Sequence, residues 1–165
     1  MNKKFKLIES DSIEINGHKL YRVQALIDFK DIKAGDLGGY VENENNLSQI
    51  DDCWIYGKAS LYDNARVFGN ARVYGNANVY DNARISGNAR VTDNACISGD
   101  AHVYGNACVY ENARVTDNAC VYGNAHIYGN AHISGIARIF EHAHVCANVT
   151  ISGKANIYNN THIFW

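Results

Sequence analysis

The stretch Val67-Phe68-Gly69-Asn70-Ala71-Arg72, followed at once by Val73-Tyr74-Gly75-Asn76-Ala77-Asn78, sets the pattern of most of this chain. From Ile55 to His162 the sequence can be written in such six-residue units, here called hexads, without a gap. The first position of a hexad is always Ile, Leu or Val, and the fifth is Ala except at Val149 and Thr161. A fixed short period of this kind indicates a repeat protein whose units pack on their neighbours.

Each hexad predicts a short strand and a corner. In Ala71-Arg72-Val73-Tyr74 apolar and outward residues alternate, which is typical of a strand with one buried face. Gly-Asn or Asp-Asn then follows, and because Gly and Asn tolerate positive φ, we expect a bend there. Three such faces would close a coil of three hexads, so the repeat gives about six coils, rising about 4.8 Å each to a length of about 30 Å.

The near-perfect Gly-Asn-Ala hexad resembles the hexapeptide-repeat superfamily of left-handed parallel β-helices, which includes acyltransferases and γ-class carbonic anhydrases. With Gly38-Gly39-Tyr40-Val41 and Asn46-Leu47-Ser48-Gln49 before it, the chain is most similar to YdcK-like solenoid proteins, which carry a transferase label by analogy. The resemblance covers about two thirds of the chain. It implies the triangular cross-section and the left hand, since right-handed crossovers are the general rule for parallel strands. The expected fold class is therefore all-β, a left-handed parallel β-helix of about six triangular coils of three hexads with a small N-terminal β cap.

Residues 1–48 do not follow the repeat and are expected to form this cap, and residues 49–165 the β-helix. Ile13 to Tyr21 predicts a hairpin around Asn16-Gly17. The glycine-rich run Gly35 to Gly39 lacks the spacing and the lysine of a phosphate loop, and we interpret it as a turn. At the other end, Glu141-His142 has neither Gly nor Asn and predicts a distorted corner. Trp165 is expected to fold over the last rung or to leave it open for a second molecule.

Composition excludes several classes of partner. The formal net charge is -2 and the pI is near 6.4, so we expect no nucleic acid and no anionic membrane. No apolar run has the length of a signal peptide or a membrane span, which favours a cytoplasmic protein. The five cysteines form no CxxC pair and no two are 18 residues apart, so they are interpreted as reduced thiols. No cofactor is expected.

Two surface features are candidate binding sites. Arg66 above Arg84 and Arg72 above Arg90 predict a basic corner near the cap that would hold phosphate or a nucleic-acid backbone, with Asp63, Asp81 and Asp93 expected to neutralise much of its charge. A second column, interrupted by Ser86, carries Phe68, Tyr104, Tyr122, Phe140 and Tyr158. Stacked aromatics stabilise neighbouring rungs, and they also suit a protein contact or self-association.

A third column contains Arg72, Arg90, Cys108, His126, His144 and His162. Imidazole and thiolate are zinc ligands, so His126, His144 and His162 are candidate metal ligands, and a solvated histidine ladder is the alternative.

Two functions follow from these observations. The first is a non-enzymatic binding module that presents a rigid surface to a protein or to itself, as an end-to-end dimer or a trimer; an inhibitor or sequestering protein of a mobile element would fit this class. The second, implied by the resemblance, is an acyltransferase that uses acetyl-coenzyme A at a subunit interface. The available bases would be His102, His126, His132 and His144. The repeat, however, has no extruded loop that could enclose a donor pocket.

Overall fold

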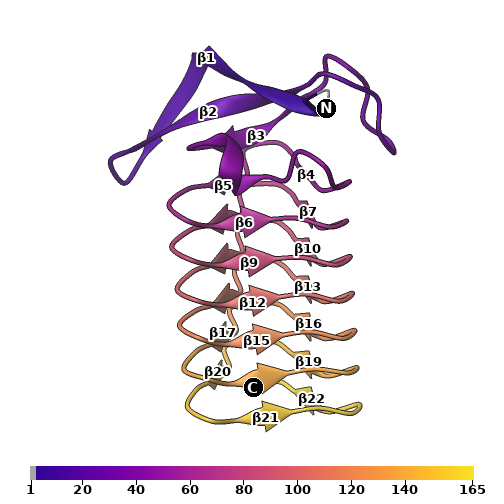
Figure 1. Cartoon of the computed structure of the whole chain (residues 1–165). Helices are drawn as coiled ribbons and strands as arrows, with labels where there is room; N and C mark the ends of the chain where they lie inside the picture. Colours follow the sequence, from indigo (N-terminus) through magenta and orange to yellow (C-terminus); the bar gives the residue numbers. More distant parts are fainter. Residues whose placement is uncertain (1–2) are drawn as a thin grey trace.

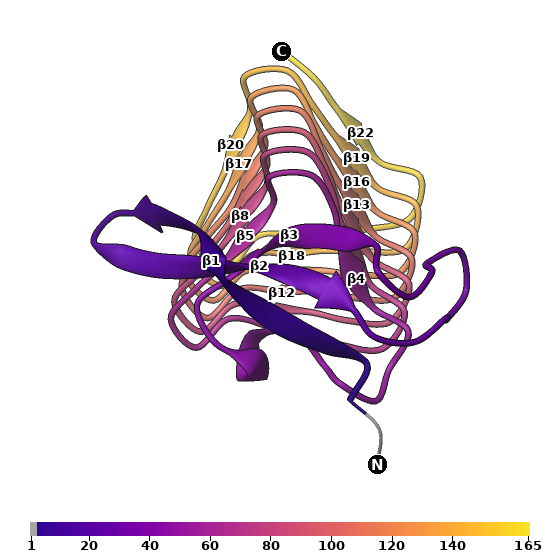
Figure 2. The ribbon, with the colours of Figure 1, turned by 90° about the horizontal axis from the view of Figure 1, so that it is seen from above.

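The sixth position of each hexad and the first position of the next form a two-residue strand, with the first position buried and the sixth facing outward. A computed structural model describes residues 3–165, in which these strands stack into a parallel β-solenoid of about seven turns (Figure 1). Seen from above, the turns are triangular and the N-terminal hairpin lies across the first of them (Figure 2). The all-β parallel solenoid is confirmed, and its left hand stays a prediction.

The solenoid strands form three sheets. The six-stranded sheet contains β6 (Arg66–Val67), β9 (Arg84–Ile85), β12 (His102–Val103), β15 (Cys120–Val121), β18 (Arg138–Ile139) and β21 (Asn156–Ile157). The seven-stranded sheet contains β4 (Trp54–Ile55), β7 (Arg72–Val73), β10 (Arg90–Val91), β13 (Cys108–Val109), β16 (His126–Ile127), β19 (His144–Val145) and β22 (His162–Ile163). The nine-stranded sheet contains β1 (Phe5–Ile15), β2 (His18–Ala25), β3 (Leu37–Val41), β5 (Ser60–Leu61), β8 (Asn78–Val79), β11 (Cys96–Ile97), β14 (Arg114–Val115), β17 (His132–Ile133) and β20 (Thr150–Ile151).

The expected register of 18 residues is confirmed throughout the repeat. Val73 lies directly above Val91, and Arg72 above Arg90. Three backbone N–H groups of most hexads donate to the next turn, as in Arg72 N to Ala89 O at 3.0 Å and Tyr74 N to Val91 O at 2.8 Å. Inside this ladder the branched first positions and the fifth-position alanines are fully buried from Ile55 to Val145. Burying each Val or Ile stabilises the fold by about 1.5–3 kcal/mol.

The residue that makes the bend of each corner differs from the expected one. Positive φ is found at the third position of the hexad, as at Gly105 with φ 71° and Asp81 with φ 57°, and the following Asn does not adopt it. Glu141 has φ 58° and occupies a regular corner, so the prediction of distortion there is wrong. A carboxylate side chain at this position accepts a backbone hydrogen bond from the next turn, which offsets the cost of the left-handed backbone. Glu141 Oε2, for example, accepts from Asn159 N at 2.7 Å.

The corner asparagines form ladders instead. Asn76 Nδ2 donates to Asn94 Oδ1 at 3.1 Å, Asn94 to Asn112, Asn112 to Asn130, and Asn130 to Asn148. A primary amide has both donors and an acceptor, so it can bond to the turn before and the turn after at once. This explains why Asn recurs at the fourth position.

The N-terminal segment covers the first turn. The hairpin at Asn16-Gly17 is confirmed, with φ 52° and 85° at these two residues, and it joins β1 to β2. β3 pairs antiparallel with β2 and parallel with β5, so it connects the hairpin to the solenoid. The division at residue 48 stays a prediction.

The glycine-rich run is only partly a turn, because β3 begins at Leu37. Gly38 and Gly39 lie where the backbone passes close to the next turn: a Cβ on Gly39 would meet the carbonyl oxygen of Ala59 at 2.4 Å. The turn interpretation is therefore wrong for these two glycines, whose small size permits the close approach.

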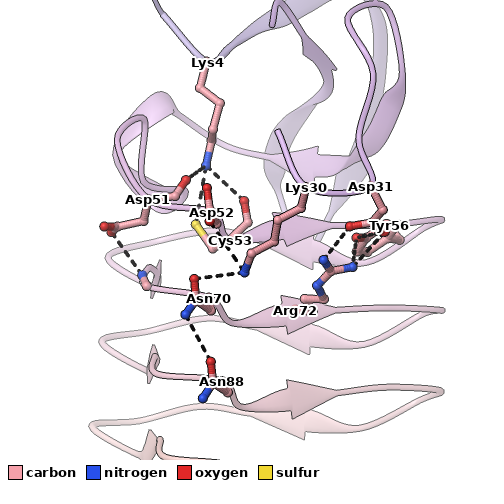
Figure 3. Close-up of polar contacts among 11 residues, drawn as sticks. Lys4, Lys30, Asp31, Asp51, Asp52, Cys53, Tyr56, Asn70, Arg72 and Asn88 are labelled. Carbon is pink, nitrogen blue, oxygen red and sulfur yellow. Dashed lines mark hydrogen bonds and ion pairs between the residues drawn. The ribbon is translucent and has the colours of Figure 1, made fainter. Parts of the chain in front are cut away.

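Lys4 attaches the N-terminal segment to the loop before β4. Its side chain points down into the loop before β4, where Nζ donates to the carbonyl oxygens of Asp51 at 2.6 Å and Cys53 at 3.0 Å (Figure 3). Nζ also lies 5.0 Å from the ring centre of Phe29. Burial lowers the pKa of the Lys4 amine. The ring of Trp54 packs edge-on against Phe5 and Phe29 to complete this small core.

The last turn is less covered than the others. Ile157 and Ile163 are half-buried, and Trp165 is 90% exposed, so it does not fold over the last rung.

Candidate binding face and junction cleft

The strands of the six-stranded sheet stack in register (Figure 1), so their outward side chains form two parallel columns, together called here the arginine–aromatic face. The sixth-position column contains Arg66, Arg84, His102, Cys120, Arg138 and Asn156. The second-position column contains Phe68, Ser86, Tyr104, Tyr122, Phe140 and Tyr158. The two columns flank the buried first positions because successive residues of a strand point to opposite sides.

The predicted aromatic column is a continuous stack over four turns. Ring centres of Tyr104 and Tyr122 lie 4.9 Å apart, those of Tyr122 and Phe140 also 4.9 Å, and those of Phe140 and Tyr158 5.3 Å. The rings are close to parallel, because the in-register backbone sets both their spacing and their direction. Tyr104 and Tyr158 remain 37% and 47% exposed, so the stack presents apolar surface to the solvent.

The arginines of this face have no ionic partner among the residues that the structure describes. Within residues 3–165 no carboxylate oxygen lies within 4.0 Å of a guanidinium nitrogen of Arg66, Arg84 or Arg138. Arg66 lies directly above Arg84 in the parallel register, and like charges opposite each other are unfavourable. The expected neutralisation by Asp63, Asp81 and Asp93 is thus not found at these arginines. An anion bound here would remove the repulsion.

The upper end of the face is hollowed where the chain crosses from the cap to the solenoid. A cleft of about 440 Å³ lies here, lined by Arg66, Arg84 and Phe68 of the face. It is also lined by Glu44 and Asn45 of the 3-10 helix η1 (Glu44–Asn46) and by the following Leu47, Ser48 and Gln49. Asn46 holds η1 in place, since its amide donates to the carbonyl oxygens of Asp63 and Ala65. Two guanidinium groups and an aromatic ring therefore meet in one concave site.

The second arginine pair lies on a different sheet and is used differently. Arg72 donates from Nη1 to Asp31 Oδ2 at 2.9 Å and from Nη2 to Asp31 Oδ1 (Figure 3). The hydrogen bonds from Arg72 lower the pKa of the Asp31 carboxyl to about 2. Lys30 from the same loop donates to Asn70 Oδ1 at 2.9 Å. Arg72 therefore attaches the 26–36 loop to the solenoid, and only Arg90 of this pair is free of a carboxylate in the described chain.

The histidine column stacks as predicted. Ring centres of His126 and His144 lie 4.8 Å apart, and those of His144 and His162 4.7 Å. Burial lowers the pKa values of His126 and His144. Metal binding by this column stays a prediction, and its stacked rings do not bring three ligand nitrogens to within 4.8 Å of one another in the described chain.

Sequence reasoning missed three features. Tyr56 stacks on Tyr74 and Tyr62 on Tyr80, so aromatic columns begin on the other two faces as well; the 18-residue spacing contains this signal. The junction cleft was missed as well, because η1 lies outside the 18-residue spacing that relates the residues of the face. The third is a cluster of His18, Glu42 and Asp63, from segments with no common spacing.

The five cysteines are free thiols, and Cys53 is buried beside Lys4. Burial raises the pKa of the Cys53 thiol. The described chain contains no helix with the length and hydropathy needed to span a bilayer.

Together these features define a parallel β-solenoid repeat protein with one flat, basic and aromatic face. Two stretches of the sequence, residues 59–75 and 83–99, match the family model described as YdcK Beta solenoid repeat. They contain β5 to β7 and β9 to β11, in the first regular turns. The chain thus carries YdcK-type solenoid repeats, which confirms the resemblance seen in its hexads. No curated protein matches the sequence significantly.

Proposed function

We propose that this chain is a non-enzymatic binding module that docks a protein partner on its arginine–aromatic face. The observation that carries the proposal is the combination of a four-ring aromatic stack with three arginines that lack ionic partners, on one flat sheet. Tyrosine and arginine are the residue types enriched in protein interfaces and in their hot spots. Outside the junction cleft the face is flat, whereas small-molecule sites are concave.

The charge of the face favours an acidic partner. Two copies of this face brought together would place arginine against arginine, so self-association through the face is unfavourable. An acidic protein segment would instead relieve the repulsion between Arg66 and Arg84, and in the junction cleft one carboxylate can accept from both guanidinium groups. Apolar side chains of the same segment would cover the rings from Tyr104 to Tyr158.

The acyltransferase alternative stays a prediction with no structural observation in its favour. Every turn from Leu61 onward keeps the 18-residue register, so no inserted loop walls a donor pocket along the solenoid. Acetyl-coenzyme A is expected to leave the melting temperature unchanged, and a clear stabilisation would reopen this function.

The proposal is tested by site-specific photo-crosslinking in the source cell. A photoreactive phenylalanine analogue replaces Tyr122 on the face, and Tyr110, which stacks on Tyr128 on the seven-stranded sheet, is the matched control position. The crosslinked partner peptide is identified by mass spectrometry. Arg84→Glu/Arg138→Glu reverses the charge of the face, and Arg114→Glu, exposed on β14 of the nine-stranded sheet, is the matched charge control.

Adducts are expected at position 122 and not at 110, on a peptide rich in Asp and Glu, and to fall at least about ten-fold with the double charge reversal, since charge-pair losses of this kind cost 2 kcal/mol or more. Arg114→Glu should leave them unchanged. Equal labelling at both positions, adducts to a second copy of the chain, adducts to nucleic acid, or no adduct at all would contradict the proposal.

A further inference from the structure

We infer that His18, Glu42 and Asp63 form a binding site for a divalent transition metal ion, with Zn²⁺ as the best match to their ligand types. In the described chain these are the three side chains whose potential ligand atoms all lie within 4.8 Å of one another. They lie at the junction between the hairpin and the solenoid. The inference is independent of the proposed function.

The separations between the ligand atoms fit one small ion. His18 Nδ1 lies 3.0 Å from Glu42 Oε1, and His18 Nε2 lies 3.6 Å from Asp63 Oδ1. Two ligands at zinc-ligand distances in a tetrahedral site are about 3.3 Å apart. The two carboxylates lie against different nitrogens of the ring, so the side chains must rotate for one imidazole nitrogen and one oxygen of each carboxylate to reach the same ion. Ligand atoms of all three residues already lie within 4.8 Å of one another, and water would complete the shell.

The hydrogen-bonding capacity of His18 leaves room for a cation. A neutral imidazole has a single N–H and can donate to only one of the two carboxylates that flank it. The distance of 3.6 Å from Nε2 to Asp63 is too long for a good hydrogen bond. The hydrogen bond with Glu42 raises the pKa of the His18 imidazole, so a metal ion would displace a proton from this ring. With the imidazole neutral, the two carboxylates carry the charge that a divalent ion balances, and imidazole with carboxylate is a common zinc ligand set.

The surroundings hold each ligand in position. Glu42 Oε2 accepts from the backbone N of Asp63 at 2.7 Å, which fixes the carboxylate and the corner against each other. The imidazole of His18 lies on the ring of Tyr62 with 5.0 Å between ring centres, and Tyr62 is itself buried and stacked on Tyr80. Such supporting contacts are what orient the ligands of protein metal sites. The side chains of all three ligands are 31% exposed, so an ion has access.

A metal at this place would connect three segments. His18 begins β2, Glu42 follows β3, and Asp63 forms the first corner after β5. The ion would join the tip of the hairpin to the first turn, on the side away from the Lys4 and Arg72 contacts.

The test measures Zn²⁺ binding to the full chain, first stripped with a chelator, by isothermal titration calorimetry and by thermal unfolding with and without Zn²⁺. Asp63→Asn and Glu42→Gln remove ligand charge with little change of shape. Asn suits the positive φ of this corner, since Asn159 has φ 58° at the equivalent position. Asp81→Asn, the same corner one turn further on, is the matched control, and His144→Asn tests the competing histidine column.

The wild type, Asp81→Asn and His144→Asn are expected to bind one equivalent of Zn²⁺ and to melt at a higher temperature with the ion present. Asp63→Asn and Glu42→Gln should bind about 10- to 100-fold more weakly, with their metal-free melting curves still cooperative. A cobalt(II) complex should show no thiolate charge-transfer band, which excludes the cysteines as ligands. Binding below a tenth of an equivalent, binding that survives Asp63→Asn, or binding lost in His144→Asn would overturn the inference.

Discussion

The third residue of each hexad carries the bend of a corner and is filled by Gly, Asp or Glu in most turns. Glycine adopts positive φ without strain, whereas Asp and Glu accept the strain and offset it with a hydrogen bond. Asp81 Oδ2 accepts from Gly99 N at 2.9 Å, and Glu111 Oε2 from Gly129 N at 2.7 Å. The acidic residues of the repeat are thus structural, and this accounts for their absence as partners of the face arginines.

Glu111 permits a direct test of this compensation. Glu111→Ala keeps the strained φ of 60° and loses the hydrogen bond, so it should lower the free energy of unfolding by about 1–2 kcal/mol. Glu111→Gly also loses the bond but relieves the strain and should cost about 1 kcal/mol less than Ala. Urea unfolding of both variants measures the difference. Equal values would show that the corner is not strained.

The histidine stack predicts a pH dependence of stability. Because burial holds the pKa values of His126 and His144 below the unfolded value near 6.5, the folded chain binds fewer protons than the unfolded chain. The stability from this stack is complete above pH 6.5 and is lost as the pH falls through the lower folded pKa values. We expect His126→Asn/His144→Asn to flatten the decline in melting temperature between pH 7 and 5. His102→Asn, on another face, should leave this decline unchanged. An unchanged slope in the double variant would refute this.

At the scale of the element, a strand of two residues has almost no stability of its own, and the turn above and the turn below supply its hydrogen bonds. Each corner adds an amide ladder to the backbone ladder, as in the run from Asn76 to Asn148. On another edge the ladder is shorter: Asn82 donates to Asp100, a carboxylate that cannot donate further, and Asn118 below it is followed 18 residues later by Ile136, which has no amide.

Asn112 and Asn118 therefore form a matched pair. Asn112 donates to Asn130 and accepts from Asn94, so Asn112→Ala should lower the free energy of unfolding by about 0.5–1.5 kcal/mol. Asn118→Ala, at the same hexad position but with no side-chain partner in the described chain, should cost less. Chemical denaturation of the two variants compares them, and an equal loss would mean that the ladders contribute nothing beyond the backbone.

At the scale of the whole molecule, the solenoid is a one-dimensional stack in which each turn is covered by its neighbours. Burial is complete in the middle turns and decreases at the last one, where Ile157 is half-buried and Ile139, one turn above it in the same column, is fully buried. The hairpin covers the first turn through β3 and through contacts made by Lys4 and Arg72.

This gradient predicts unequal costs for the same substitution. Ile139→Ala should lower the free energy of unfolding by about 2–5 kcal/mol, because it leaves a cavity between two turns. Ile157→Ala removes the same atoms from a partly solvated site and should cost less than half as much. Denaturant unfolding followed by circular dichroism measures both. A similar loss for the two variants would show that the last turn is covered in solution, for instance by a second copy.

The sequence alone determined the solenoid, because a local pattern repeated without interruption specifies the same strand, corner and register in every hexad. The aromatic column, the histidine stack and the pairing of Arg66 with Arg84 all followed from the 18-residue spacing. The position of the bend within a single hexad was less certain: positive φ falls on third-position residues such as Asp81 and Glu141 and not on the fourth-position asparagines, since a carboxylate can be compensated by a neighbour that the local pattern does not include.

Only the tertiary structure decided what happens where the period ends. The junction cleft, the attachment of Arg72 to Asp31 and the cluster of His18, Glu42 and Asp63 all join residues of the N-terminal segment to the first turns. The fold of the hairpin and its loop decides which of these residues meet, and no fixed spacing along the chain relates them. The repeat does not encode these contacts, because they form only where the N-terminal segment packs on the solenoid.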